Sequence, residues 1–253
     1  MQITFLGTGT SQGVPVINCD CPVCCSLDPK DKRLRCAVLI QENNSNYVID
    51  IGPDFRQQML KNEVKWLNGI LITHEHNDHI IGLDDVRPFN FKQREEMKLY
   101  AAQQVLDDLS KRFEYVFSES PYPGAPRIHI FPIENKPFIM DNIPIIPIKV
   151  KHGNLDVFGF RIKDFCYVTD ANFIAEEEKE KLKNAKILVL NALHREKHYS
   201  HFNLAEALEI IDELKPEQAY LTHLSHRMGS HEETSKELPP NVQLAYDGLK
   251  LEI

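Results

Sequence analysis

The sequence is poor in basic charge and has no long apolar run. Its 253 residues include 29 Lys and Arg against 37 Asp and Glu, a formal charge of −8 with neutral histidines. This balance argues against a sequence-independent nucleic-acid coat, because neutralising phosphates needs a basic surface. No apolar run approaches the roughly 18 residues of a membrane-spanning helix, so we expect no membrane contact. The 42% apolar and 26% charged residues exclude collagen-like, disordered and disulfide-scaffold proteins.

The N-terminus lacks the features of a signal peptide, since Met1–Gly7 has neither a basic nor an apolar leader region. We therefore expect a cytoplasmic protein, in which cysteines are more often metal ligands or buried thiols than disulfides. Four of the six cysteines fall within seven residues, at positions 19, 21, 24 and 25. This clustering indicates a metal site, whereas Cys36 and Cys166 are expected to be buried thiols.

Short β-type runs alternate with helical patterns along the whole chain, which predicts sheets covered by helices. Apolar positions recur every three or four residues in 204–214, and helices are also expected over 103–113 and 174–182. The strand candidates are residues 2–6, 37–41, 47–51, 69–73, 98–101, 143–150, 157–162, 166–169, 187–190, 219–222 and 242–245. No composition shift marks a boundary, so we expect a single domain over residues 1–253.

A dense histidine pattern follows the apolar run 69–72. It reads Thr73-His74-Glu75-His76-Asn77-Asp78-His79. His74 and His76 are two residues apart, hence on one side of an extended strand end, and the segment 80–86 could open a helix behind Asp78 and His79. Neutral imidazole and carboxylate are good ligands for zinc and manganese-type ions. The sequence thus predicts a metal site, the alternative being a polar loop capped by Asp78.

This pattern resembles the H-x-H-x-D-H signature of the metallo-β-lactamase superfamily. The resemblance implies an αββα sandwich, in which two mixed β-sheets are covered by helices. It also implies two catalytic metal ions, whose later ligands match residues at the C-terminal ends of apolar runs. One ion would be held by His74, His76 and His152 and the other by Asp78, His79 and His223, with Asp170 bridging them.

A further aspartate matches the superfamily pattern in Val48–Gly52. Asp50 corresponds there to the residue that braces the ligand loop. Ligand imidazoles generally need such an acceptor behind them, which agrees with this role.

The cysteine cluster offers three thiolates within six residues, Cys19, Cys21 and Cys24. A structural zinc needs four tetrahedral ligands. Cys25 could serve only awkwardly because it is adjacent to Cys24, and which of these two is the third thiolate stays open. His226 is the better fourth ligand, since it lies three residues after His223 and on extended backbone the two imidazoles point to opposite sides. The alternative is a buried thiol cluster without metal.

Three further stretches extend the resemblance to the PhnP phosphodiesterases, which hydrolyse cyclic ribosyl phosphates and carry an extra structural zinc. They are Gly7–Val16 before the cysteines, Gly82–Phe89 and Tyr246–Gly248. The N-terminal zinc-binding loop would then span residues 19–25. The relatives suggest a homodimer.

One more histidine cluster lies just before the helix expected over 204–214. His201 matches the catalytic histidine of the PhnP group, which implies a general acid or a donor to the phosphoryl oxygen. Asp78 and His201 are therefore the expected catalytic residues, and His198 is a candidate assistant. The remaining histidines have no motif and are expected at the surface: His129, His194 and His231.

We therefore predict a metal-dependent phosphodiesterase that acts on a small phosphodiester, with ribosyl cyclic phosphate as one candidate. A hydroxide held by two divalent ions, zinc or manganese, would attack phosphorus, and one structural zinc would complete the cofactors. The alternatives are a tRNase Z-like RNA 3′ endonuclease, a thioester or lactone hydrolase of the same superfamily, and a zinc-dependent binding module. The first would need a basic arm to grip tRNA, and the sequence has no long insertion of that kind.

Overall fold

The computed structural model describes all 253 residues, which form two β-sheets packed face to face. The first sheet has seven strands in the order β15 (Lys250–Glu252), β1 (Gln2–Gly7), β2 (Ala37–Glu42), β3 (Ser45–Ile49), β4 (Gly69–Leu71), β5 (Met97–Ala102) and β6 (Ile128–Ile133). The main path of the second sheet runs β11 (Phe173–Ile174), β8 (Ile143–His152), β9 (Leu155–Ile162), β10 (Phe165–Val168), β12 (Ile187–Asn191), β13 (Gln218–Thr222) and β14 (Val242–Leu244), and β7 (Phe138–Met140) pairs with β8. Both sheets mix parallel and antiparallel pairs.

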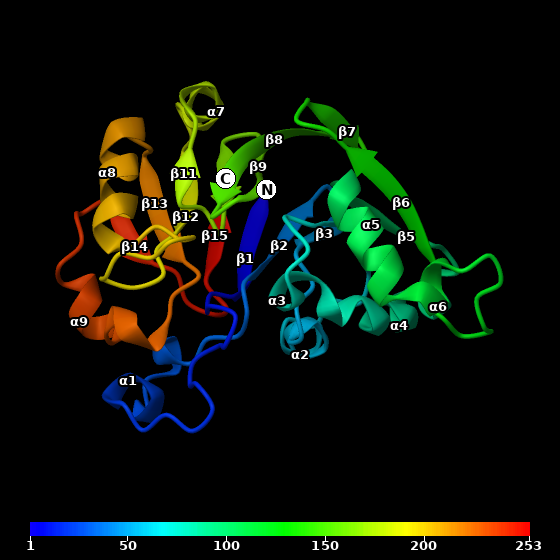
Figure 1. Cartoon of the computed structure of the whole chain (residues 1–253), viewed down its shortest axis with the longest axis horizontal. Helices are drawn as coiled ribbons and strands as arrows, with labels where there is room; N and C mark the ends of the chain where they lie inside the picture. The colour runs from blue at the N-terminus through cyan, green and yellow to red at the C-terminus, as the bar shows by residue number, and fades with distance from the viewer.

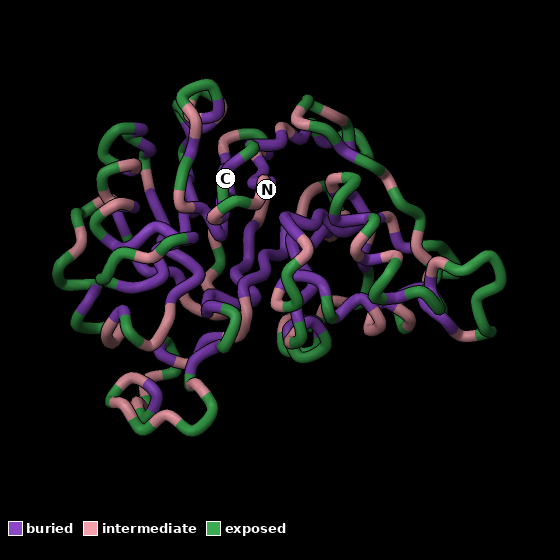
Figure 2. Tube along the Cα trace, viewed as in Figure 1, coloured by how far each residue is buried: buried purple, intermediate pink, exposed green.

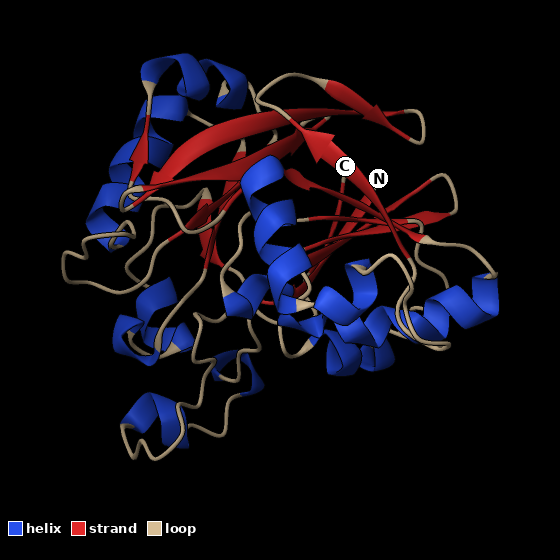
Figure 3. Cartoon of the chain, turned by 45° about the vertical axis from the view of Figure 1, so that its right-hand side comes forward, coloured by secondary structure: helices blue, strands red, loops and turns tan.

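Helices cover the outer faces of both sheets (Figures 1 and 3). The first sheet is covered by α2 (Phe55–Lys61), α3 (Asn77–Ile80), the 3-10 helix η2 (Ile81–Val86), α4 (Arg87–Gln93), α5 (Gln103–Arg112) and α6 (Glu114–Phe117). The second is covered by α7 (Glu176–Leu182), α8 (Leu204–Leu214) and α9 (His231–Ser235). None of these helices combines the length and apolarity that a membrane span requires.

Three apolar cores separate these four layers. Side chains of a strand alternate between its two faces, so in β12 Leu188 and Leu190 join the core beneath α8, whereas Val189 enters the core between the sheets. In β3, Val48 likewise packs under the helices of the first sheet. The αββα sandwich predicted from the sequence is confirmed.

The predicted elements are found with small shifts at their ends. The helix α8 begins at Leu204, where Asn203 and Glu206 form a capping box, and its apolar face is buried as the spacing predicts. The helix expected over 174–182 begins only at Glu176, because Ile174 pairs with Val150 as part of β11. The strands β6, β7, β11 and β15 were not predicted.

A small lobe projects from the body of the molecule around α1 (Pro22–Cys25) and the 3-10 helix η1 (Pro29–Asp31) (Figure 1). Most of this lobe is exposed or half-buried, in contrast to the strands of the sandwich (Figure 2). Two of its apolar side chains lie in solvent: Ile17 is 92% and Leu27 97% exposed. The lobe therefore has almost no apolar core of its own.

Candidate metal centres

The predicted ligands of the catalytic site converge where four strands of the two sheets end. The segment from His74 to His79 follows β4 of the first sheet. His152 ends β8, Asp170 follows β10 and His223 follows β13, all in the second sheet. A hydrogen bond from Phe158 N to the Thr73 carbonyl (3.1 Å) ties the sheets together beside this point.

The first group of side chains comprises His74, His76, His152 and Asp170, whose potential ligand atoms all lie within 4.8 Å of one another. The Nε2 atom of His74 is 3.0 Å from His76 Nδ1 and 3.7 Å from Asp170 Oδ2. His152 Nε2 is 4.0 Å from the same carboxylate oxygen. Three imidazoles thus face one oxygen of Asp170.

The second group comprises Asp78, His79, Asp170 and His223, again within 4.8 Å. Asp170 Oδ2 is 3.5 Å from His79 Nε2 and 3.3 Å from His223 Nε2. The carboxylate of Asp78 is 3.2 Å from His79 Nε2. One oxygen of Asp170 is therefore common to both groups, the position that a bridging ligand needs.

The donor atoms of this site suit divalent cations. The Nε2 atoms of His79 and His223 are buried and have no hydrogen-bond partner, and burying such a group without a partner is costly. Burial lowers the pKa of His74 and so keeps its ring in the neutral ligand form. Burial opposes ionisation of Asp170, but His223 and His79 hold the pKa of its carboxyl well below the ordinary value. These side chains therefore fit metal ions, with Asp78 and Asp170 as the anionic ligands.

Hydrogen bonds behind the imidazoles fix which nitrogen faces the site. Asp50, at the end of β3, lies 2.7 Å from His79 Nδ1 and accepts hydrogen bonds from the backbone and hydroxyl of Thr73. His152 Nδ1 donates to the Ser200 carbonyl at 2.7 Å. Each of these two rings therefore keeps its Nε2 for the site. The structure places Asp50 in the bracing position that the resemblance implied, whereas no sequence pattern predicted the contact with the Ser200 carbonyl.

Glycine at position 52 allows this arrangement. A Cβ on Gly52 would lie 2.0 Å from the Asp78 carbonyl oxygen. The close approach holds the start of α3 against the loop after β3, where Ile51 N donates to the His79 carbonyl at 2.8 Å. Any larger residue would push Asp78 away from the second group.

His201 lies beside both groups and is buried. Its ring centroid is 4.6 Å from that of His152 and 4.8 Å from that of His223. Burial and the neighbouring His223 lower the pKa of His201 to about 2, so its imidazole is neutral. Of the two roles that the sequence left open, donation of a hydrogen bond from the ring N–H suits a neutral imidazole better than action as a charged acid.

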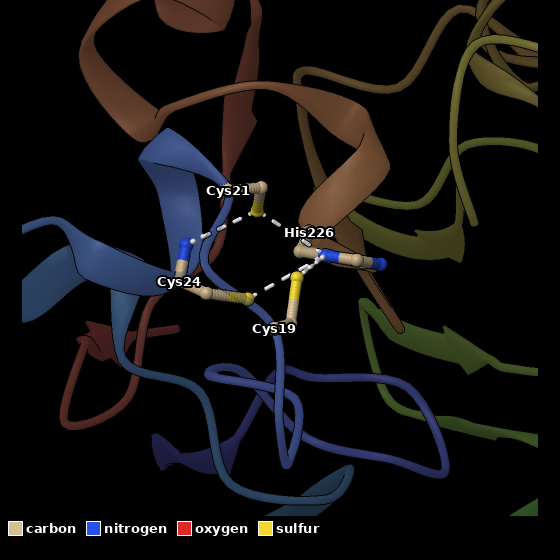
Figure 4. A group of neighbouring side chains, drawn as sticks. All are labelled: Cys19, Cys21, Cys24 and His226. Carbon is tan, nitrogen blue, oxygen red and sulfur yellow. Dashed lines mark hydrogen bonds between the residues drawn. The ribbon is translucent and has the colours of Figure 1, made fainter.

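The small lobe around α1, called the cysteine lobe below, carries three side chains of a second, separate group (Figure 4). The sulfur atoms of Cys19, Cys21 and Cys24 lie 3.2, 3.3 and 3.5 Å from His226 Nδ1. Cys25 is exposed and outside this group, so the structure brings Cys24 rather than Cys25 to the other ligands. The four side chains offer the composition and number of ligands of a closed zinc site.

The prediction of an extended backbone from His223 to His226 was wrong. The backbone between His223 and His226 is not extended, because His223 has a positive φ of 56° and η3 (His226–Met228) is a 3-10 helix. The two imidazoles nevertheless serve different groups. The turn, rather than strand alternation, separates them.

Two histidines expected at the surface are not exposed. His194 is buried, and His231 is half-buried with its Nδ1 3.3 Å from the guanidinium of Arg33. His129 is exposed, as expected. Cys36 and Cys166 are buried thiols, as expected, and burial raises the pKa of each to about 12.

Known proteins share this architecture. Residues 45–224 match the family described as "Beta-lactamase superfamily domain". The crystal structure of a new diphosphatase from the PhnP family is 38% identical, with a TM-score of 0.93, and the match covers 100% of this chain and 97% of that one. Zn²⁺-bound PqqB from Methylobacterium extorquens has a TM-score of 0.83 at 17% identity, covering 100% of both chains, and shares the fold.

A relative from Porphyromonas gingivalis is named octanoyltransferase. It is 39% identical over 253 residues, which are 99% of this chain and 51% of that protein. The chain thus spans about half the length of this relative. From the family match and the extent of the structural likeness, the chain belongs to the beta-lactamase superfamily and, within it, to the PhnP family, which has the fold of metal-dependent hydrolases.

Proposed function

We propose that this protein is a metal-dependent phosphodiesterase that cleaves a small phosphodiester or diphosphate ester. The observation that carries the proposal is the position of Asp170, one of whose oxygens faces both groups of imidazoles while His201 lies alongside. The diphosphatase from the PhnP family supports phosphorus rather than carbon as the reacting centre. Ribosyl cyclic phosphate remains one candidate substrate.

We assign the seven side chains of the two groups to two catalytic divalent ions, zinc or manganese. When bound, such ions supply Lewis acidity and activate water. Asp170 positions both groups about one point, and Asp78 contributes the carboxylate of the second group. The neutral His201 ring donates its N–H to the phosphoryl oxygen, where negative charge develops as phosphorus is attacked.

We assign one further zinc to Cys19, Cys21, Cys24 and His226. Its role is structural, because four protein side chains fill all four coordination positions of a tetrahedral zinc and leave none open for a substrate. Burial raises the pKa of Cys24 to about 11, while a hydrogen bond from the Cys24 backbone, with smaller help from His226, lowers that of Cys21 to about 6.

The substrate is proposed to be a small molecule rather than tRNA. The charge of −8 disfavours a long polyanion, and the cation at the site must overcome that charge locally. The chain has no long basic insertion of the kind that a tRNA endonuclease needs, and the loop of residues 118–127 between α6 and β6 carries only one acidic and one basic side chain, Glu119 and Arg127. A cytoplasmic homodimer is the proposed form.

A second candidate is an acyl thioester hydrolase, favoured by the P. gingivalis relative named octanoyltransferase. Both reactions would use the same ions. They differ in the need for a hydrogen bond to a phosphoryl oxygen, so loss of His201 should affect the phosphodiesterase far more than the thioesterase.

The test is turnover of bis(p-nitrophenyl) phosphate and diadenosine diphosphate, against octanoyl-coenzyme A, by metal-loaded protein. We expect the phosphoesters to be cleaved and His201→Ala to lower kcat about 100-fold. Cleavage of the thioester alone would establish the second candidate. Binding without turnover of any of the three would leave a zinc-dependent binding module as the function.

A further inference from the structure

A cleft of about 700 Å³ opens beside the first metal group. Its walls include two of the proposed ligands, His76 and His152, together with Asn154, Asn172 and Tyr199. The cleft is therefore continuous with the place where the phosphoryl group would sit. Any part of the substrate that extends from the phosphoryl group past His76 and His152 would occupy this cleft.

Tyr199 presents a large aromatic ring to solvent at this cleft. The residue is 82% exposed, and its hydroxyl has no hydrogen-bond partner in the protein. The ring lies 4.7 Å from that of His198 and beside the turn at Gly153, where a Cβ would be 3.8 Å from the ring atoms Cδ2 and Cε2. An accessible aromatic face beside the cleft is available for a planar group to stack on.

The position of Tyr199 is set by the metal site itself. The next residue, Ser200, is buried, and its carbonyl accepts the hydrogen bond from His152 Nδ1. This contact fixes the backbone that carries the tyrosine ring with respect to a proposed metal ligand. The backbone at Tyr199 is thus held beside the cleft that its side chain lines.

Amide side chains supply the polar contacts of the same cleft. Asn172 Oδ1 accepts a hydrogen bond from Gly153 N at 2.7 Å, which orients the amide and leaves its NH₂ group without a partner in the protein. Asn154 follows in the exposed turn between β8 and β9. Amides read the donor and acceptor edges of heteroaromatic rings.

The charge of the cleft argues against a second phosphate in it. No lysine or arginine lines the cleft, and apart from the histidines its one ionisable side chain besides Tyr199 is that of Glu75. A neutral, planar, hydrogen-bonding ring suits these walls better than an anion.

We infer that Tyr199, Asn154 and Asn172 form a subsite for a planar heteroaromatic ring, so that the substrate is of the nucleotide class. The ring stacks on Tyr199 while its edge meets the two amides. This inference rests on the proposed function, because the subsite is placed relative to the phosphoryl group. It distinguishes a nucleotide ester from a ribosyl phosphate that lacks a base.

The first test is binding, measured by calorimetry on zinc-loaded protein with AMP and ribose 5-phosphate, which differ only in the base. Base–aromatic stacking predicts that Tyr199→Ala weakens AMP binding about tenfold and leaves ribose 5-phosphate unchanged. Tyr199→Phe should bind both like the wild type. The matched control is Phe91→Ala, an exposed aromatic on α4 outside the cleft, which should change neither.

The second test is turnover of diadenosine diphosphate against dimethyl diphosphate. Tyr199→Ala should raise KM about tenfold for the former with kcat within about twofold, because the ring contributes binding rather than chemistry. Equal losses for AMP and ribose 5-phosphate, or no loss for either, would overturn the subsite. If no phosphoester is cleaved but Tyr199 still discriminates AMP, the proposed function fails and the subsite stands.

Discussion

The two candidate metal centres are built in opposite ways. The ligands of the dinuclear group stand at the ends of buried strands, and His74, His79, Asp170 and His223 are almost completely inaccessible. The cysteine group stands in a lobe in which Cys24 is its only buried ligand and large apolar side chains lie in solvent. In the first centre the fold places the ligands. In the second, we expect a zinc bound by the ligands to stabilise the lobe.

The largest expected effect is at the oxygen shared by both catalytic groups. Asp170→Ala should reduce turnover by well over the 10- to 100-fold that loss of an outer partner of a ligand costs. The three cores do not depend on this carboxylate, so the melting temperature of the metal-free protein should change little. Turnover and metal content measured on the same sample would check this, and wild-type rates would remove Asp170 from the site.

A smaller effect is expected at Asp50, which contacts the proposed ligand His79 and is not itself a proposed ligand. Asp50→Asn keeps the size of the side chain but exchanges an acceptor for a donor facing His79 Nδ1. We expect a 10- to 100-fold loss in metal affinity or kcat with the fold intact. The affinity is measured by competition with a chelator, and an unchanged value would mean that Asp50 has no part in orienting His79.

The cysteine lobe should respond in its stability. Cys21→Ser should remove one zinc per chain and lower the melting temperature by about 10 °C, since structural zinc contributes to folding. The matched control is Cys25→Ser, because Cys25 is exposed and outside the group. Metal analysis and calorimetric melting give both readouts. An unchanged zinc content in Cys21→Ser would eliminate this centre.

The smallest effect concerns Asp247, in the loop between β14 and β15 that joins the two sheets. Burial raises the pKa of Asp247 to about 6, against hydrogen bonds from Leu34 N and the Thr8 hydroxyl. Between pH 4 and 6 the folded protein therefore holds a proton that the unfolded chain has released, and the stability present below pH 4 is lost as the pH rises through 6.

The variant Asp247→Asn cannot ionise and should escape this loss. Over that window its free energy of unfolding should fall by roughly 2 kcal/mol less than that of the wild type. Urea titrations at a series of pH values measure the difference. Parallel pH curves for the two proteins would show that Asp247 does not carry the proton.

The features that could be predicted from the sequence are those that depend on side chains close together in the chain. The motif from His74 to His79 places four of the seven proposed ligands within one short segment, and the ends of apolar runs indicate where the other three lie. The Ser200 carbonyl could not be predicted, since every residue has a carbonyl and only the fold brings this one to His152. The sequence shows a glycine at position 52, but the close approach of its backbone to the Asp78 carbonyl appears only in the fold.

The strands at the sheet edges escaped prediction for a related reason. In β15, Lys250–Glu252 carries charges at both ends and gains its strand conformation by pairing with β1. In β6 most side chains are exposed or half-buried, so no apolar alternation marks it. Pairing partners, rather than local propensity, decide such segments.

Only two residues separate His223 of the dinuclear group from His226 of the cysteine group. Leu224 N donates to the Thr8 carbonyl and Ser225 N to the Leu193 carbonyl, both at 2.9 Å, so the interval is a pinned turn. If zinc binds in the lobe as proposed, we expect its restraint of His226 to lower the entropy lost when His223 is ordered for the proposed second catalytic ion. By reciprocity, that ion tightens zinc binding in the lobe by the same factor.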